Sequence, residues 1–339
     1  MVTNRFERQK RTAFLLFLFP LVIVLCLFGF FLSLKWGQAS VSWSTFFEAI
    51  TFQGQGREHL YIQTLRLPRA LGTFLVGVHM ALAGLLTQAI TKNPVASPHV
   101  FGINAGASFA VVIGLLLFTN FSLTGAIYFA FLGAVLGAVL VFLLAGIDQK
   151  QHIQLVLAGI AIHFLFTSLT EGLIILNQQS TESMLFWLVG AVDQLGWYEL
   201  KTILPWTFFG ILLFAIMLPS FKLLVLDDDV AAGLGQRVMA VKVTGMLIVI
   251  LLAGSAVAIC GPIGFVGLLV PHIARSLVGY DLKVLVPLTA LLGGMLLIYA
   301  DLLSRFIAFP YESPVGIVTA LIGGPFFIYL ARKKGVTER

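Results

Sequence analysis

Long apolar runs, separated by short polar connections, recur along this 339-residue chain and constrain its fold more than any other feature. An α-helix crosses the ~30 Å hydrocarbon core of a bilayer with about 20 residues, which is close to the length of these runs. The sequence therefore predicts an all-α polytopic membrane protein with about ten transmembrane helices. The predicted spans are residues 12–34, 68–90, 99–118, 123–147, 153–176, 202–221, 239–260, 262–279, 284–303 and 314–331.

Composition excludes a soluble protein. Hydrophobic residues make up 59% of the chain and charged residues 11%, whereas roughly 25% of the residues of ordinary soluble domains are charged. The connections between runs are too short for a separate soluble domain, so residues 1–339 are predicted to form a single transmembrane domain. Cys26 and Cys260 lie in apolar runs and are expected to be buried as small hydrophobic side chains, without a disulfide or metal site.

Lys and Arg are distributed unevenly between the two sides of the predicted bundle. With both basic termini placed in the cytoplasm, 15 of the 21 Lys and Arg residues fall in cytoplasmic segments and 6 in outside segments. Cytoplasmic loops of membrane proteins carry an excess of these residues, so this orientation is favoured over its mirror image. It also agrees with an even number of spans.

Gly and Pro interrupt the apolar pattern at residues 93–98 and 261–265. Such breaks are tolerated at membrane depth where freed backbone groups find partners or face water, and each is equally compatible with an ordinary tight connection. Small residues also recur at the four-residue spacing that lets helices approach closely, within the chain or across a dimer contact. The pairs are Gly102/Gly106 and Gly133/Gly137.

The predicted span 153–176 carries an unusual set of polar residues, His163, Thr167, Thr170 and Glu171. Their spacing places them on one helical face. Ionisable groups in a span normally face a bundle interior or water, so the set indicates a pathway lining, a hydrogen-bond network between helices or a proton relay. A single histidine in another span, His79, is expected to be packed and hydrogen-bonded rather than to bind a ligand.

The cytoplasmic loop at about 226–238 has the pattern of a short capped helix. Asp227, Asp228 and Asp229 suit a helix N-terminus, where the backbone dipole favours anions. Ala231 and Ala232 continue the helix, and Gly233 and Gly235 end it. The segment is either a docking element for a soluble partner or a solvated connector.

Three arginines lie on the predicted outer side, against the charge bias. Arg66 and Arg69 open the second span, and Arg305 closes the ninth. They are either anchors at the membrane boundary or a positive ring that binds acidic residues of an outside partner, since the planar guanidinium meets carboxylates bidentately.

The chain has no recognisable catalytic motif. No Lys follows a Gly, so a phosphate-binding GxxxxGK[ST] loop is absent, and there is no zinc-type Cys/His cluster, GxSxG or HExxH. We therefore predict no enzyme, no cofactor and no metal site. Any ATP that drives transport must be hydrolysed by another subunit.

A series of short motifs runs from about residue 60 to the last span. In order they are Leu65-Arg66-Leu67-Pro68-Arg69; Ala83-Gly84 with Gln88; Asn93-Pro94-Val95-Ala96; Gly102-Ile103-Asn104-Ala105-Gly106-Ala107; Leu157-Ala158-Gly159; Ala231-Ala232-Gly233-Leu234-Gly235; Gly261-Pro262-Ile263-Gly264-Phe265-Val266-Gly267-Leu268 with Pro271-His272; Ala300-Asp301 with Arg305; and Glu312 with Pro314, Gly316 and Thr319-Ala320-Leu321-Ile322-Gly323-Gly324-Pro325. In this order they resemble the FecCD-type ABC importer permeases, the membrane subunits of importers for iron–siderophores, haem and vitamin B12.

The resemblance implies a type II ABC importer permease of ten helices, paired with a second, identical or related permease around the pathway. It also implies two cytoplasmic ATPase subunits, an extracytoplasmic substrate-binding protein, a metal-chelate substrate and no nucleic acid. The expected location is the bacterial cell membrane, as a multi-pass protein in contact with lipid and with both termini cytoplasmic.

The resemblance also assigns roles to particular residues. Arg66, Arg69 and Arg305 match the positions that receive glutamates of the binding protein. The cytoplasmic gates map to Asn93 and Val95 and to His152 and Ile153. The ATPase-coupling segment maps to Asp227, Asp228, Asp229, Ala231, Ala232, Gly233, Leu234 and Gly235.

These observations predict the permease subunit of an ATP-driven importer, working by alternating access and carrying iron–siderophore complexes. Two other classes compete with this prediction. A proton- or ion-coupled secondary transporter would use His163 and Glu171, and a membrane-embedded enzyme would need a catalytic constellation that the motifs do not supply.

Overall fold

Helices make up nearly all of the regular structure in the computed structural model of this chain. The structure describes residues 2–37, 41–54, 56–118, 121, 123–145, 152–177, 188–224 and 226–337. Within these residues there is no β-strand, which confirms the predicted all-α class.

The described residues include seven helices long and apolar enough to cross a membrane and three shorter apolar helices. Every predicted span overlaps one of them. The long helices are α1 (Val2–Lys35), α4 (Leu67–Ile90), α6 (Leu123–Ala145), α7 (His152–Leu176), α9 (Trp197–Leu223), α11 (Val238–Val249) with its continuation through η4 (Ile250–Gly254) and α12 (Ser255–Cys260), and α14 (Leu282–Ile307). The shorter ones are α5 (Ile103–Leu117), α13 (Val266–Val278) and the apolar part, Val315–Leu330, of α15 (Val315–Thr337).

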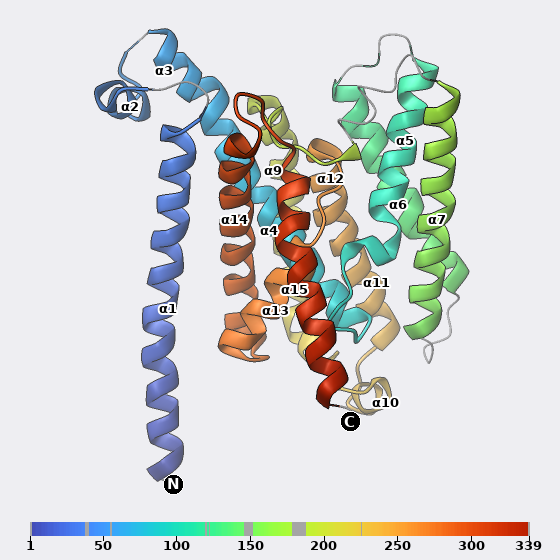
Figure 1. The fold of residues 1–339 in the computed structure, drawn as a ribbon. Coiled ribbons are helices and arrows are strands. Elements are labelled where there is room, and N and C mark those ends of the chain that lie inside the picture. Colours follow the sequence, from blue (N-terminus) through green and yellow to red (C-terminus); the bar gives the residue numbers. More distant parts are fainter. Residues whose placement is uncertain are drawn as a thin grey trace.

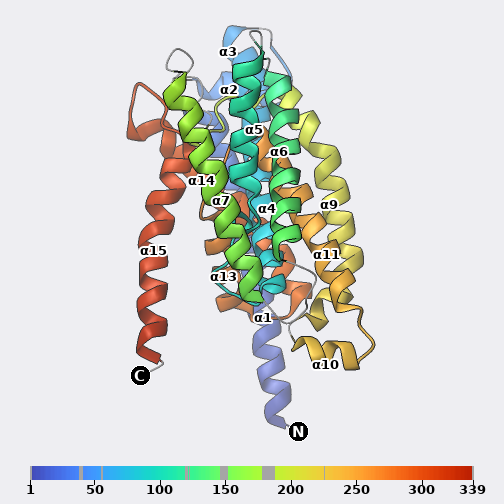
Figure 2. The same cartoon turned by 90° about the vertical axis from the view of Figure 1, so that its right-hand side faces the viewer.

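Short elements occupy the two ends of the bundle. At one end α2 (Trp43–Ile50) and α3 (Arg57–Tyr61) precede the π-helical η1 (Ile62–Arg66), which runs directly into α4. A 3₁₀ turn, η2 (Pro98–Phe101), precedes α5, and α10 (Asp228–Gly233) lies between α9 and α11. Both chain termini lie at the end that carries α10, as an even number of spans requires (Figures 1 and 2). We call this the α10 end and the opposite one the α3 end.

Helix α4 forms the centre of the bundle and packs against α14, α13, α11 and α9. In the most apolar 18-residue stretch of the continuous helix Arg57–Ile90, which includes α4, 83% of the residues are buried. In the corresponding stretches of α1 and α7 only 22% of the residues are buried. Helices α1 and α7 stand at opposite edges of the bundle in Figure 1. Much of the apolar surface of the edge helices is therefore left for lipid or for another protein to cover.

Glycines allow the closest helix contacts, as their spacing predicts. A Cβ atom added at Gly106 of α5 would lie 2.2 Å from the carbonyl oxygen of Gly133 in α6. In the same way, a Cβ at Gly84 of α4 would lie 1.9 Å from the carbonyl oxygen of Gly267 in α13. Because a side chain at either position would collide with backbone, these small residues serve packing within the chain.

The two Gly/Pro breaks meet in space. A Cβ on Gly267 would lie 2.9 Å from Cδ of Pro98, and one on Gly264 would lie 3.9 Å from Nε2 of His99. The chain turns sharply at both places, with left-handed backbone at Gly102 (φ 68°) and Phe265 (φ 67°). The breaks therefore shorten α5 and α13 at one common site inside the bundle.

His79 is a buried structural residue, as predicted. Its Nε2 lies 2.8 Å from Oγ1 of Thr207 in α9, and its Nδ1 lies 3.1 Å from the carbonyl oxygen of Leu252. Leu252 belongs to the π-helical η4, where the wider turn frees carbonyl groups for partners outside the helix. The histidine thus ties three spans together.

Candidate functional site

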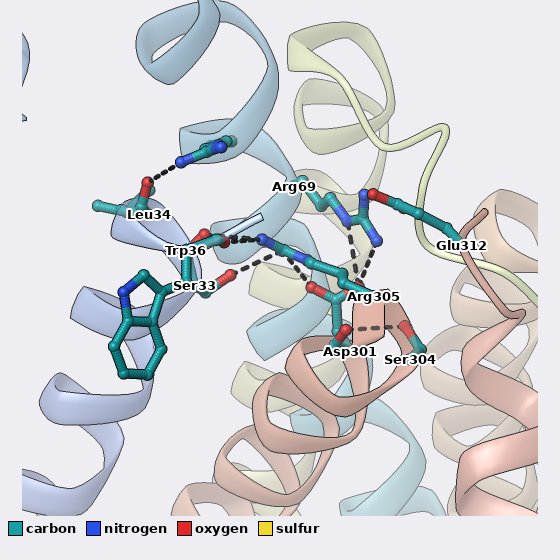
Figure 3. Close-up of polar contacts among 9 residues, drawn as sticks. Ser33, Leu34, Trp36, Arg69, Asp301, Ser304, Arg305 and Glu312 are labelled. Carbon is teal, nitrogen blue, oxygen red and sulfur yellow. Dashed lines mark hydrogen bonds and ion pairs between the residues drawn. The ribbon is translucent and has the colours of Figure 1, made fainter. Parts of the chain in front are cut away.

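A cluster of charged residues lies at the α3 end, where α1, α4, α14 and the segment before α15 converge (Figure 3). We call it the arginine cluster, and it consists of Arg66, Arg69, Asp301, Arg305 and Glu312. Each of its three arginines is held by groups of this same chain. Two carboxylates thus accompany three guanidinium groups.

Arg69 joins α4 to α14 and to the segment before α15. Its Nη2 and Nε donate to Oδ1 of Asp301 at 2.6 and 3.1 Å. Its Nη1 donates to Oε2 of Glu312 at 2.6 Å. The Asp301 side chain is fully buried, whereas those of Arg69 and Glu312 are 12% and 21% exposed. The Arg69–Glu312 pair is therefore the part of the cluster that water or a partner can reach.

Arg305 and Arg66 hold the C-terminal end of α1. Arg305 pairs with Asp301 and donates to the carbonyl oxygens of Ser33 and Trp36 at 2.8 and 2.9 Å. Arg66 donates to the carbonyl oxygens of Leu34 and Lys35, both at 2.9 Å. The last carbonyls of a helix lack partners within it and carry partial negative charge, so both arginines act as caps.

This geometry gives the three predicted docking arginines a role inside the chain. Arg66 and Arg305 are each 3% exposed, so their guanidinium groups do not form an open positive ring on the surface. Their predicted role in binding an outside partner stays a prediction.

The predicted short helix in the loop after α9 is present as α10. Asp227 precedes it, it ends at Gly233, and Gly235 follows in a left-handed conformation (φ 85°) that glycine adopts without strain. Ala231 is completely buried and anchors the helix, whereas Val230 and Leu234 are 52% and 63% exposed. The helix thus presents two apolar side chains to the surroundings of the bundle.

Asp228 fixes α10 to two spans. It pairs with Lys92, at the end of α4, at 2.9 Å and with Lys242 of α11 at 2.5 Å. Partial burial by itself would raise the pKa of this carboxyl, but the hydrogen bonds and charges of Lys242 and Lys92 outweigh it and lower the pKa below its ordinary value. The carboxylate is therefore ionised at neutral pH.

The predicted gate residues fall in two places. Asn93 and Val95 lie in the loop after Lys92, where Oδ1 of Asn93 accepts a hydrogen bond from the backbone N–H of Val95 at 3.0 Å. His152 begins α7, but the side chains of His152 and Ile153 lie outside the described part of the structure. Asn93 thus directly follows Lys92, one of the two partners of Asp228.

The four polar residues of α7 that are predicted to line a pathway differ in how deeply they are buried. His163 and Glu171 are exposed on α7, Thr167 is half-buried, and Thr170 is buried with its hydroxyl bonded to the carbonyl oxygen of Phe166 at 2.7 Å. Among the described residues, no hydrogen bond or ion pair joins His163 to Glu171. Only His163 and Glu171 thus lie on the exposed side of α7, whereas Thr170 faces the interior.

The carboxylate partners of the arginines and of Lys92 are not predictable from the sequence patterns. In the sequence Asp301 and Glu312 appear only as parts of a motif, and Asp228 only as a residue of a helix N-terminus. The one available signal was the presence of two acidic residues, Asp301 and Glu312, next to apolar spans that are otherwise almost free of charge.

Comparisons with known proteins agree on one family. A family model described as the FecCD transport family matches residues 25–333. The Fe(3+)-citrate import system permease protein YfmD of Bacillus subtilis is 44% identical over 325 residues, which cover 96% of this chain and 97% of that protein. The ferric enterobactin transport system permease protein FepD of Escherichia coli is 37% identical and matches 93% of this chain and 95% of its own length.

A further relative and a solved structure complete these comparisons. The iron(3+)-hydroxamate import system permease protein FhuB of Bacillus subtilis is 40% identical over 92% of this chain and 81% of its own length. The solved structure is an inward-facing conformation of a metal-chelate type ABC transporter. It superposes with a TM-score of 0.82 at 30% identity, covering 92% of this chain and 97% of that one.

Proposed function

The chain belongs to the FecCD transport family, and from this premise we propose that it is the permease subunit of an ATP-driven importer for iron–siderophore complexes. In this proposal it pairs with a second permease, two ATPase subunits and a substrate-binding protein. The α10 end faces the cytoplasm and the α3 end faces outward. ATP binding by the partners stabilises one access state over the other, which is what any shift between two states requires.

The names of the relatives support a ferric cargo. They couple ferric iron to citrate, to hydroxamate and to enterobactin, so the metal is common to them and the organic ligand varies. The proposal therefore commits to a ferric chelate of the siderophore class.

Helix α10 is the proposed contact for the ATPase subunits. Its exposed Val230 and Leu234 offer an apolar knob, and exposed Asp227 and Asp229 surround it with negative charge. A short helix with a buried anchor, Ala231, can be pushed as a unit because it is fixed to the bundle at one side.

The contacts of Asp228 support a route from α10 to the proposed gate. Its partner Lys92 also donates to the carbonyl oxygen of Leu226 at 2.8 Å, so the start of α10 and the residues just before it are tied to the end of α4. Asn93 follows Lys92 directly. A displacement of α10 by an ATPase subunit would therefore be transmitted to the loop that holds Asn93 and Val95.

The outer partner is proposed to dock over the arginine cluster, with Arg69 and Glu312 as the accessible pair. Arg66 and Arg305 would support this surface by fixing α1 beneath it. A glutamate from the binding protein would have to compete with Glu312 for Arg69, so docking would exchange one carboxylate for another.

The exposed polar side of α7 supports the second permease and a shared pathway. Polar and ionisable groups in a span are costly against lipid and normally face protein or water. Covering His163 and Glu171 by a second copy or a related permease would remove them from lipid and place them along a pathway.

Uptake by reconstituted vesicles tests this proposal. The chain is co-purified with its ATPase subunits, inserted into proteoliposomes and supplied with the binding protein and radioactive iron as citrate, hydroxamate or catecholate chelates. We expect uptake of one chelate class that requires ATP on the α10 side. An ATPase variant that cannot hydrolyse ATP is the control.

Two outcomes would contradict the proposal. Accumulation driven by a proton gradient without ATPase subunits would favour the secondary transporter that His163 and Glu171 suggested. Uptake without any binding protein, at the same rate, would remove the outer docking step.

A further inference from the structure

A cavity of about 260 Å³ opens at the α10 end between α4, α9, α13 and α14. Its inner part is apolar and is lined by side chains such as Leu85, Phe214 and Leu285. Its mouth is polar and is lined by Lys92, Arg275 and Tyr280, and Gln88 adds a buried polar side chain to the lining. None of these residues belongs to the arginine cluster or to the exposed side of α7, and only Lys92 is shared with the contacts of Asp228.

The lining residues give the cavity a length and a direction. On α4 they run from Leu85 to Lys92 and on α9 from Phe214 to Phe221, and each of these stretches is about two helical turns, or roughly 10 Å. The charged residues all lie at the mouth. A ligand that fits this gradient has an anionic head and an apolar tail.

Arg275 is the unusual group at the mouth. It donates a hydrogen bond to Oε1 of Gln88, and the amide nitrogen of Gln88 faces the carbonyl oxygens of Gly267 and Leu268 at 3.3 and 3.5 Å. Lys92 is neutralised by Asp228, but no carboxylate of the described residues lies within ion-pair distance of Arg275. The guanidinium is thus oriented by Gln88 and keeps its positive charge for another anion.

The mouth lies where lipid headgroups are expected. Tyr280, 72% exposed in the turn between α13 and α14, is of the residue type enriched at membrane–water boundaries. Basic pockets between spans at a bundle end bind anionic lipid headgroups, and the planar guanidinium suits a phosphate oxygen pair. Exposed Lys222 and Lys283 add positive charge at the same end.

We propose that this cavity binds an anionic phospholipid, with its phosphate on Arg275 and the start of one acyl chain between α4 and α9. The volume of about 260 Å³ is just below the ~300 Å³ of the smallest typical ligand pockets, so it receives part of a lipid rather than a whole molecule. A carboxylate of a protein partner would pair with Arg275 but would leave the apolar inner part of the cavity, about two helical turns long, empty. The inference needs only a membrane location and does not depend on the cargo or on ATP.

The test uses the full chain in nanodiscs that contain equal amounts of phosphatidylglycerol and phosphatidylcholine. Native mass spectrometry after detergent extraction counts the lipids that stay bound. We expect wild type to retain phosphatidylglycerol selectively, and Arg275→Gln to retain about fivefold less, the effect of one basic residue near a membrane surface. Lys283→Gln, which removes an exposed cation beside the cavity-lining Leu282, is the matched control and should retain lipid like wild type.

A second variant fills the cavity without changing charge. Ala89 lines it, and Ala89→Phe should abolish selective retention while Arg275 is kept. Size-exclusion elution and the melting temperature show whether each variant is folded. If Arg275→Gln does not fold, Arg275→Lys replaces it as a variant that keeps the positive charge.

Four results would overturn the proposal. They are equal retention of both lipids by wild type, equal retention of phosphatidylglycerol by Ala89→Phe, binding of inorganic phosphate without retained lipid, and displacement of the retained lipid when the ATPase subunits are added. The last result would assign the cavity to a protein partner.

Discussion

The two ends of the bundle handle positive charge in different ways. At the α3 end the guanidinium groups of Arg69 and Arg305 share the fully buried carboxylate of Asp301, and Arg305 also caps α1. At the α10 end Asp228 is only partly buried between two lysines, and Arg275 has Gln88 as its protein partner. Apart from the accessible Arg69–Glu312 pair, the α3 end pairs its charges in a buried cluster, whereas at the α10 end Arg275 has no carboxylate partner among the described residues.

This difference indicates which end can move at low cost. Buried ion pairs are expensive to break because a charge is left without a partner in a low-dielectric region, whereas partly exposed pairs are replaced by water. The α3 end should therefore act as a rigid tie between α1, α4 and α14. The α10 end should rearrange when a partner pushes on it.

The largest predicted effect comes from Asp301→Asn. The substitution leaves Arg69 and Arg305 buried with one carboxylate fewer, and removal of one partner of a buried pair typically costs about 3–5 kcal/mol. We expect the free energy of unfolding to fall by that amount, as measured by SDS titration of the purified protein in mixed micelles. Asp229→Asn, at an exposed position of α10, is the control. A loss below about 1 kcal/mol, the level of a surface pair, would show that the cluster is not a buried tie.

Arg66→Gln tests the cap on α1 separately. Two hydrogen bonds from a charged donor to the carbonyl oxygens of Leu34 and Lys35 are lost, and we expect a cost of about 2 kcal/mol. Protease cleavage between α1 and α2 should become faster in the same variant, because the end of α1 is released. Arg57→Gln removes an exposed arginine of α3 and should change neither quantity. Unchanged cleavage in Arg66→Gln would contradict the capping role.

Glu312→Gln tests the accessible part of the arginine cluster. Arg69 keeps Asp301, so the predicted stability loss is only about 1 kcal/mol. If docking exchanges one carboxylate for another, removal of this competitor should strengthen binding of the substrate-binding protein, measured by surface plasmon resonance on nanodiscs. Weaker binding would mean that Glu312 itself contacts the partner.

Features set by local sequence were predictable, and contacts between distant segments were not. The ten spans follow from hydropathy, the α5–α6 contact from glycine spacing, and α10 from its aspartates and glycines. The pairing of Arg69 with Asp301 joins residues 232 positions apart, and no local pattern encodes it. Charge bias reports the membrane side of a residue and not its burial, so it could not predict that Arg66 and Arg305 are almost fully buried. The cavity at Arg275 was missed because four separate helices form its walls.

The smallest predicted effect is a pH dependence confined to α10. The pKa of Asp228 is lower in the folded protein than the ~3.9 of an unperturbed aspartate, so its stabilising contribution is complete above that value. The contribution is lost as the pH falls through the lower, folded-state pKa. Since the pair is partly exposed, it amounts to no more than about 1 kcal/mol.

A nitroxide label on Ala232→Cys reports the mobility of α10, because the native Cys26 and Cys260 are buried. The label should keep constant mobility from neutral pH down to about pH 4 and become more mobile below it, since protonation of Asp228 releases Lys92 and Lys242. With Asp228→Asn added, it should be mobile at every pH. The same label at exposed Arg57 of the α3 end should not respond in this range, which separates local release from general unfolding. Equal mobility of α10 with and without Asp228 at neutral pH would mean that the ion pairs do not fix this helix, and the contrast between the two ends would then rest on Arg275 alone.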